Sequence, residues 1–375
     1  MASLLFKDTV PAVVLRPMWR TRLRGNNAML STTNHAAARL AAGQPPVLIV
    51  IVDTEEEFAW DRPFDRANID TASVAAQPLM HERVFNRFGI VPAYMVDWPV
   101  ATAPQAVATL RRLMQEGRCD IGTQLHPWVS PPYEEQVTRF NSYAGNLPRE
   151  LELAKLRMLT NAIGDAFGRA PTAFKSGRYG LGPHSAEAVA ALGYEIDASV
   201  VPYTRFEDDG APDFRAFDEH PYWFETGGRR LLELPVTTGY AGWLRGMGPR
   251  LFDMARSPAG RALRMGGVLA RSRALERIRL SPEVASGNEM RRLTRALRAD
   301  GCEVFSLTYH SPSLVPGHTP YVRDAADRER LISTIHDYCA WFRDEIGGQF
   351  MALSQVGAAL APRAVSTPRA LEAVR

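Results

Sequence analysis

The chain has 375 residues, of which 46% are hydrophobic and 23% are charged, and its formal net charge is +3. This is a globular composition, its small net charge gives no reason to expect nucleic acid as a partner, and no apolar run reaches the roughly 18 residues that span a bilayer. The three cysteines, at positions 119, 302 and 339, are too widely spaced for a disulfide framework or a zinc motif. We therefore expect a protein without a transmembrane segment in a reducing compartment, the cytoplasm.

Residues 1–45 have no regular pattern and are expected to be poorly structured, with translation beginning at either Met1 or Met29. Four arginines, at positions 16, 20, 22 and 24, could touch an anionic surface and make the protein peripheral at the inner membrane, although disorder is the simpler interpretation. The tail, 362–375, is also expected to be disordered. The folded part is therefore predicted to span residues 46–361.

The first apolar run of the folded part, Val47–Val52, predicts a strand buried on both faces. An acidic run follows at once, and alternate residues of a strand point to the same side, so Asp53 and Glu55 are expected to project together from its carboxyl end. Two adjacent carboxylates repel unless a cation or a shared proton relieves them. The pattern therefore indicates a metal site or an acid/base pair, and a solvated acidic turn is the alternative.

Apolar strand-like segments alternate with segments of helical spacing along the rest of the chain. Strands are predicted at 47–52, 90–96, 119–124, 171–176, 194–200, 230–236, 304–310 and 349–353. Helices are predicted at 72–88, 104–116, 148–168 and 184–192, and within 288–299 and 324–345. This alternation is typical of a parallel sheet with right-handed crossovers, and seven to eight units favour a distorted (β/α) barrel over a doubly wound sheet.

Residues 240–287 interrupt this alternation, and the part from 245 to 279 is rich in Arg, Leu, Gly and Met. The segment could form a helical cap over the mouth of the barrel. It could also form a patch for an anionic sugar or a membrane surface. The preferred interpretation is a helical insertion at the surface whose arginines are solvated.

Residues of catalytic type follow the ends of successive predicted strands: Asp53 and Glu55, Gln124 and His126, Lys175 and Arg178, and finally His310. The carboxyl ends of barrel strands meet at one rim, where such folds carry their chemistry. A packed core would not tolerate so many polar groups without partners. The sequence therefore predicts a polar centre at one end of the barrel.

The order of these motifs resembles that of the polysaccharide deacetylase (NodB homology) family, in the branch of deacetylase-like proteins of bacterial lipopolysaccharide and polysaccharide biosynthesis. The resemblance is carried by Asp53–Glu55, Gly122–Trp128, Phe174–Gly180, Glu233–Pro235 and Leu307–Pro312, and also by Arg279–Glu283 and Pro316–Val322.

This resemblance implies a NodB-like barrel that removes acetyl groups from an N-acetylated sugar or glycan with a divalent metal, zinc or similar. It implies that Asp53 is the general base, that Arg178 orients it, that the Tyr179 backbone N–H serves the oxyanion, and that His310 is the general acid. It also implies that Glu55 and His126 hold the metal. We add Gln124 as a third metal ligand, and Trp128, Lys175 and Trp98 as substrate-binding residues.

The chain departs from the family pattern in its second motif, where two histidines four residues apart are usual. Here Gln124 and Trp128 occupy those places on either side of His126. A glutamine oxygen is a weaker ligand than imidazole for zinc. A catalytically weak or inactive glycan-binding or assembly protein on the same barrel is therefore the second hypothesis. A glycosidase that uses Glu55 and Glu233 as its carboxylate pair is the third.

Overall fold

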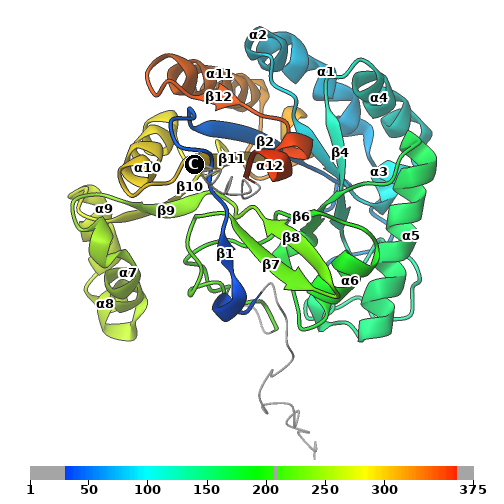
Figure 1. Cartoon of the computed structure of the whole chain (residues 1–375), viewed down its shortest axis with the longest axis horizontal. Coiled ribbons are helices and arrows are strands. Elements are labelled where there is room, and N and C mark those ends of the chain that lie inside the picture. Colours follow the sequence, from blue (N-terminus) through cyan, green and yellow to red (C-terminus); the bar gives the residue numbers. More distant parts are fainter. Residues whose placement is uncertain (1–29, 207–209, 361–375) are drawn as a thin grey trace, which may run out of the picture.

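The computed structural model describes residues 30–206 and 210–360, and a curled sheet wrapped by helices forms its centre (Figure 1). Seven parallel strands follow one another in space, and β12 (Gln349–Phe350) adds a parallel pairing to the strand at Val47–Thr54. In spatial order the seven are β8 (Arg229–Glu233), β6 (Ile196–Asp197), β5 (Ala173–Ser176), β4 (Asp120–Leu125), β3 (Ala93–Val96), β2 (Val47–Thr54) and β11 (Val304–His310). The predicted distorted (β/α) barrel of seven to eight strands is confirmed.

Strand β2 lies next to the end of the sheet, between β3 and β11. All eight of its residues are buried, and it pairs with β3, β11 and β12. Leu48, Val50 and Val52 join the core beneath the helices. The alternate residues Val47, Ile49 and Ile51 join a second core cluster with residues of β3, β5, β6 and β8, which fills the interior of the barrel. Because the side-chain period is two, Asp53 and Glu55 continue this interior row.

No ladder joins β8 to β11 within the described residues, so side chains rather than paired strands close the barrel there. The Thr237 backbone N–H donates to the Ser306 hydroxyl at 3.0 Å, and the Ser306 N–H donates to the Thr237 hydroxyl at 2.8 Å. Next to this contact, the Thr308 N–H donates to the carbonyl of Leu280 at 3.2 Å. These bonds satisfy backbone groups that an open sheet edge would leave unpaired.

Most predicted helices agree with the structure to within about two residues. They are α4 (Pro104–Gln115), α5 (Arg149–Phe167), α6 (Ser185–Ala191), α10 (Gly287–Ala299) and α11 (Ala325–Asp344). The helix expected at 72–88 is broken into short turns that include α1 (Gln77–Met80), a π segment (His81–Phe85) and α2 (Asn86–Phe88), and it ends at Gly89 with φ of 64°. The sequence did not predict α3 (Trp98–Thr102) or α12 (Leu353–Leu360).

The strands at the edge of the sheet differ most from expectation. The strand predicted at 194–200 is reduced to the two residues of β6. Beyond it, β7 (Tyr222–Thr226) turns back on β8 through Gly227 and Gly228, whose φ values of 56° and 73° suit a tight hairpin turn. The short strand β1 (Ala36–Ala37), in a segment expected to be poorly structured, pairs with β7.

The insertion is a helical excursion between two paired strands. β9 (Thr238–Ala241) and β10 (Glu276–Arg279) form an antiparallel ladder. Between them lie α7 (Gly248–Arg256), α8 (Pro258–Ala262) and α9 (Met265–Arg271), which stand at one side of the barrel (Figure 1). The segment between β9 and β10 is thus mainly helical in this structure.

Of the segments expected to be poorly structured or disordered, residues 1–29 and 362–375 lie outside the described residues, as do the arginines at positions 16, 20, 22 and 24. Among the helices of the described part, none combines the length and the apolarity needed to cross a membrane.

Candidate active site

A cavity of about 700 Å³ lies at the carboxyl ends of the barrel strands. Strand β2 supplies Asp53 and Glu55 to its wall, β4 leads to Gln124 and His126, β5 supplies Lys175 and β11 ends in His310. Trp128, Arg178 and Tyr179 also line it. The strand ends therefore bring together nine of the ten residues that the sequence analysis assigned to the site.

Asp53 is held by a buried lysine. Lys175 Nζ lies 2.5 and 2.7 Å from the two carboxylate oxygens of Asp53. Burial disfavours the charged lysine, but the Asp53 carboxylate outweighs it and raises the pKa of Lys175. On its other side, Asp53 Oδ2 lies 3.7 Å from His310 Nε2, because β2 and β11 pair Asp53 with His310 in register. The Asp53 carboxylate is thus in contact with both a lysine and an imidazole.

The cation in contact with Asp53 is Lys175, whereas Arg178, which was expected to orient Asp53, has other partners. The Arg178 guanidinium donates to the Ser142 hydroxyl and lies over the Tyr143 ring, 4.1 Å from its centroid. Arg178 has φ of 54°, in the left-handed region. Lys175, assigned to substrate binding, makes the contact expected of Arg178.

Glu55, Gln124 and His126 meet beside Asp53. The Gln124 amide nitrogen lies 3.1 Å from Glu55 Oε2 and 3.2 Å from His126 Nε2, and Glu55 Oε2 lies 3.5 Å from His126 Nε2. Burial raises the pKa of Glu55 to about 7, although the nearby His310 and His126 oppose this shift. Two buried oxygens, Glu55 Oε1 and Gln124 Oε1, have no hydrogen-bond partner among the described residues.

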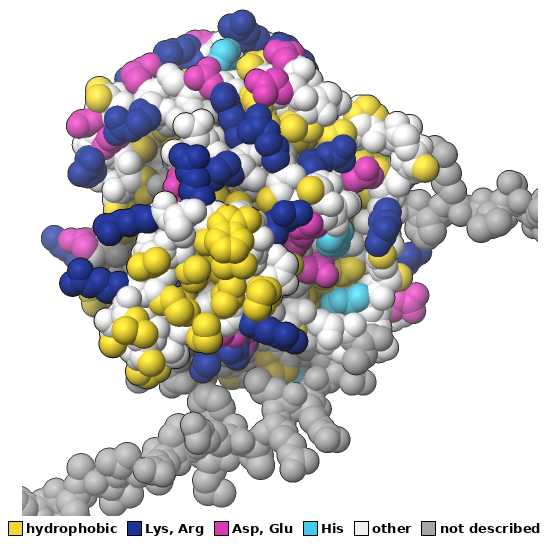
Figure 2. Space-filling model, turned by 90° about the vertical axis from the view of Figure 1, so that its left-hand side faces the viewer, with side chains coloured by type: hydrophobic (Ala, Val, Ile, Leu, Met, Phe, Trp, Pro, Cys, Tyr) yellow, Lys and Arg dark blue, Asp and Glu magenta, His cyan; other side chains and the backbone are white. Residues whose placement is uncertain are grey.

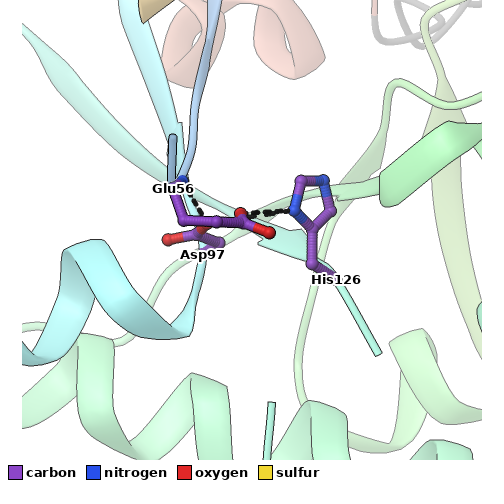
Figure 3. Close-up of side chains that lie close together, drawn as sticks. All are labelled: Glu56, Asp97 and His126. Atoms are coloured by element: carbon purple, nitrogen blue, oxygen red, sulfur yellow. Dashed lines mark hydrogen bonds and ion pairs between the residues drawn. The ribbon is translucent and has the colours of Figure 1, made fainter. Parts of the chain in front are cut away.

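The other edge of the His126 ring faces a second cluster, which Figure 3 shows. His126 Nδ1 lies 2.7 Å from Glu56 Oε2, and the Glu56 backbone N–H donates to Asp97 Oδ2 at 2.7 Å. Burial lowers the pKa of His126, so the ring is neutral. An Nδ1–H that donates to Glu56 leaves the lone pair of Nε2 directed at Glu55 and Gln124. This is the arrangement in which a neighbouring carboxylate orients an imidazole ligand.

Two groupings could hold a metal, and their hydrogen bonds distinguish them. The ligand atoms of Glu56, Asp97 and His126 lie within 4.8 Å of one another, but each carboxylate already accepts N–H groups: Glu56 from Trp128 at 2.7 Å, and Asp97 from Val100 at 2.9 Å. Neither acid lines the cavity.

The grouping of Glu55, Gln124 and His126 Nε2 has unpartnered oxygens and faces the cavity. A carboxylate, an amide carbonyl and an imidazole suit a divalent ion, so these residues fit the group that the sequence resemblance implies. A rotation of the Gln124 amide would present its oxygen to such an ion. The Glu56 and Asp97 cluster would then orient His126.

The loop that carries His126 is anchored by the second buried lysine, Lys155 of α5. Its Nζ donates to the carbonyl oxygens of Pro127, Ser130 and Pro132 at 3.1, 2.6 and 2.7 Å. The His126 ring also leaves no room for a side chain at Gly177, where a Cβ would lie 2.2 Å from His126 Cδ2. The ring of Trp128 stacks on that of His126 at 4.3 Å. The position of His126 is therefore fixed from several sides.

His310 is held by Glu283, a residue that the sequence analysis did not assign to the site. His310 Nδ1 lies 2.7 Å from Glu283 Oε2, and the His310 backbone N–H donates to Glu283 Oε1 at 3.0 Å. Burial disfavours the imidazolium, but the carboxylates of Glu283, Glu55 and Asp53 outweigh it and raise the pKa of His310 to about 10. His310 is therefore a charged proton donor whose Nε2 faces Asp53.

Several residues of the site gave little signal in the sequence. Glu56 and Asp97 stand at predicted strand ends, and only that position pointed to them. Glu283 lies in a loop with no periodicity, and Trp60 reaches His310 edge-on at 5.2 Å from a segment without regular structure. Glu283 ends one of the segments that carry the family resemblance, but no role was assigned to it, and nothing in the sequence pointed to Trp60.

Two residues lie outside the cavity wall. Trp98 is partly buried against the core and does not line the cavity, so its assignment to substrate binding is not supported by its position. Glu233 is fully buried, accepts the Val200 N–H at 2.9 Å and does not line the cavity either. Glu55 and Glu233 therefore do not flank a common substrate space, and the glycosidase hypothesis loses its carboxylate pair. None of the residues from 240 to 278 lines the cavity. The structure therefore gives no support to the alternative in which the insertion forms a helical cap over the mouth of the barrel.

Comparison with known proteins places the fold. No protein-family model and no curated protein matches the chain. Among solved structures, Puue allantoinase is 13% identical and has a TM-score of 0.50, over 85% of this chain and 91% of its own. A protein from Mycobacterium smegmatis that was provisionally assigned as a polysaccharide deacetylase is 15% identical, with a TM-score of 0.48 over 89% of this chain and 98% of its own. The chitin deacetylase of Colletotrichum lindemuthianum is 14% identical, with a TM-score of 0.36 over 86% and 92%. The likeness to the allantoinase shows that the chain shares its fold.

Proposed function

We propose that the protein is a metal-dependent hydrolase that removes N-acetyl groups from a carbohydrate in the metabolism of cell-surface polysaccharide or lipopolysaccharide. The observation that carries the proposal is the meeting of Asp53 and His310 at 3.7 Å in a cavity whose adjacent wall holds Glu55, Gln124 and His126. The order of the sequence motifs, which resembles that of the polysaccharide deacetylases, supports the same activity.

Amide hydrolysis needs an activated water and a protonated leaving amine. Glu55, His126 and Gln124 would hold a divalent ion, which when bound polarises the acetyl carbonyl and acidifies water. Asp53, held in place by Lys175, accepts the proton of the attacking water. His310, kept protonated by Glu283, donates a proton to the departing amine. The base and the acid thus line the same cavity, 3.7 Å from each other.

The turn after β5 supplies the remaining polar group. Arg178 and Tyr179 are consecutive residues with φ of 54° and 60°, a conformation that costs free energy outside glycine. Backbone strain of this kind persists only where the surrounding structure enforces it, and it is frequent at active sites. We assign to the Tyr179 backbone N–H a hydrogen bond to the oxyanion that forms on the acetyl group. One such donor lowers the activation free energy by about 3 kcal/mol.

Acetate release tests the proposal. Purified protein incubated with chitin oligomers or with acetylated bacterial polysaccharide should release acetate, a chelator should abolish the release, and an added divalent ion should restore it. Asp53→Asn should remove activity while the circular dichroism spectrum stays that of a folded protein, although loss of the ion pair with Lys175 should lower the melting temperature. Full activity of Asp53→Asn would show that another group is the base.

A second candidate is a glycan-binding or assembly protein with little or no turnover, and Gln124 in place of a histidine is the observation that favours it. Glycan binding measured by calorimetry that survives both chelation and Asp53→Asn, without acetate release, would support this alternative. Metal-dependent turnover would eliminate it.

A further inference from the structure

We infer that the substrate of this cavity carries an anionic group, a carboxylate or a phosphate, which Arg279 binds. The inference rests on the proposed function for the acetyl chemistry and adds the class of sugar. Cationic side chains outnumber acidic ones in the cavity wall, with Arg62, Arg139, Lys175, Arg178 and Arg279 against Asp53, Glu55 and Asp61. A cavity with such a surplus attracts anions and disfavours cations.

The cations are not equivalent, because most of them are already engaged. Asp53 neutralises Lys175 through two short hydrogen bonds. Arg178 is directed to the Ser142 hydroxyl and to the carbonyl of Arg139, and it stacks on Tyr143. Arg62 and Arg139 are exposed. Arg279 is the half-buried guanidinium that remains.

Arg279 makes one hydrogen bond within the described residues, from its guanidinium to the Tyr179 hydroxyl at 3.1 Å, and forms no ion pair there. A guanidinium has five N–H donors, so several are left for a ligand. The Tyr179 ring, 5.2 Å from the guanidinium carbon, restrains its plane. A planar cation held in place matches the two oxygens of a carboxylate or phosphate.

The position of Arg279 connects it to the reacting centre. Tyr179 lies between the two cations, with Lys175 Nζ 5.4 Å and the Arg279 guanidinium 5.2 Å from its ring centroid. Leu280, the next residue, forms backbone hydrogen bonds with Thr237 and with Thr308, where the barrel closes. Thr308 belongs to β11, the strand that ends in His310. Arg279 can therefore contact an anionic substituent while the acetyl group lies at Asp53 and His310, and it serves as a specificity-determining residue.

Calorimetry with three probes tests this inference: N-acetylglucosamine, N-acetylglucosaminuronic acid and N-acetylglucosamine 6-phosphate. The charged probes should bind roughly ten-fold more tightly than the neutral one, and salt should weaken them selectively. Arg279→Gln should abolish the difference while leaving the neutral probe unchanged, Arg279→Lys should restore part of it, and Arg245→Gln, at a surface ion pair with Asp300, should have no effect. The stronger of the two charged probes identifies carboxylate or phosphate as the ligand group.

Equal binding of the three probes, absence of binding by the charged ones, or an equal loss for all three in Arg279→Gln would overturn the inference. Acetate release is measured in parallel on the same probes. Selective binding without acetate release would reject the proposed hydrolase and keep the anion site. Acetate release without charge preference would do the reverse.

A separate observation concerns the insertion, and from it we infer that residues 243–273, which include α7–α9, form a docking surface for an anionic lipid bilayer. Of the nine large hydrophobic side chains that are exposed in the described residues, five belong to this segment: Trp243 (73% exposed), Met247 (51%), Met254 (53%), Leu263 (75%) and Val268 (61%). Figure 2 shows the corresponding face, on which hydrophobic side chains form a patch flanked by basic ones. Exposed apolar patches mark interaction sites.

The positive charge of the same segment indicates that the bound surface is anionic. Between residues 243 and 273 the sequence has seven arginines and a single acid, Asp253. Five of these arginines, at positions 250, 261, 264, 271 and 273, are exposed and form no ion pair within the described part of the chain. Short helices that combine exposed Trp, Leu and Met with arginine insert their apolar side chains at the headgroup level of anionic membranes.

Vesicle co-sedimentation of the full chain tests this surface. Vesicles that contain phosphatidylglycerol should bind the protein, pure phosphatidylcholine vesicles should not, and high salt should release it. Two double variants should each reduce vesicle binding at least several-fold. One replaces apolar side chains (Trp243→Ser with Leu263→Ser), and the other removes charges (Arg264→Gln with Arg271→Gln). Ile69→Ser, an exposed hydrophobic residue elsewhere, is the matched control.

Binding that is unaffected by these paired substitutions, or absent from anionic vesicles, would overturn the membrane inference. Formation of a stable dimer that Trp243→Ser abolishes would also overturn it and assign the patch to a second copy of the chain.

Discussion

Glu283 Oε2 lies 2.7 Å from His310 Nδ1, and this contact determines the protonation state of the imidazole that faces Asp53. Glu283 reaches His310 from the loop after β10, so the insertion is connected to the strand that carries the proposed general acid. A carboxylate on one ring nitrogen leaves the other to face the reacting centre. The pair has consequences that can be measured as a function of pH.

Glu283→Gln should lower the pKa of His310. Burial alone disfavours the imidazolium, and the carboxylates raise the pKa from 6.5 to about 10. The raised value stabilises the folded protein fully below pH 6.5, and this stabilisation is lost as the pH rises towards 10. In the variant, stability should therefore depend less on pH between these limits, and the alkaline limb of activity should move to lower pH.

Imidazole resonances of the metal-free protein measure this shift directly. Glu329→Gln, at a surface ion pair with Arg83, is the control and should leave the titration of His310 unchanged. A His310 that titrates at the same pH in wild type and Glu283→Gln would contradict the proposed pairing.

Lys175 and Arg178 should differ in their effect on the chemical step. Lys175→Met leaves Asp53 buried beside an apolar side chain, and loss of one partner of a buried ion pair costs about 3–5 kcal/mol in stability. The variant should unfold at a lower temperature, and its kcat should fall by about 100-fold or more. Arg178→Met should change kcat much less, because Arg178 does not contact Asp53. Equal losses of kcat in the two variants would restore the orienting role to Arg178.

Gly177→Ala should displace His126. The added Cβ would lie 2.2 Å from His126 Cδ2 and 2.5 Å from the Leu125 carbonyl oxygen, so the ring or the strand has to move. Metal content by elemental analysis and the melting temperature should both fall. Gly164→Ala in α5 is the matched control, since nothing lies within 4 Å of its added Cβ, and it should be neutral or stabilising. Unchanged metal content in Gly177→Ala would indicate that His126 is not a ligand.

Gln124→His should strengthen metal binding. Imidazole is a better ligand than an amide oxygen for zinc and similar ions, and position 124 already faces Glu55 and His126. Metal titration should show an increase in affinity of about ten-fold or more. Gln105→His, on a surface helix, controls for the added histidine. A Gln124→His protein with unchanged affinity would place the ion elsewhere, for example at Glu56 and Asp97.

The sequence predicted those helices and strands whose formation is determined by the pattern of their own residues. Val47–Val52 and Val304–His310 are apolar runs bounded by polar residues, so both strands were found at or close to their observed bounds, and Asp53 and His310 followed from them. The two-residue strands β1 and β6 exist only through pairing with distant segments, and no local pattern could indicate them.

The site was predicted in its location and less well in its contacts. Lys175 and Arg178 lie three residues apart, and the choice between them depends on strand register and on the left-handed backbone at Arg178. The contact of Glu283 with His310 spans 27 positions and depends on the path of a loop, which periodicity does not describe.

The burial of Lys155 and Lys175 has a practical consequence, because the chain contains a third lysine only at position 7. An amine-reactive reagent applied to the native protein would find no accessible lysine side chain in the described part. Acylation of either buried lysine would then show that the rim of the barrel had opened. The many arginines at the surface would not be modified, because the reagent reacts with amines. Chemical labelling followed by mass spectrometry could in this way time the exposure of the site without an engineered probe.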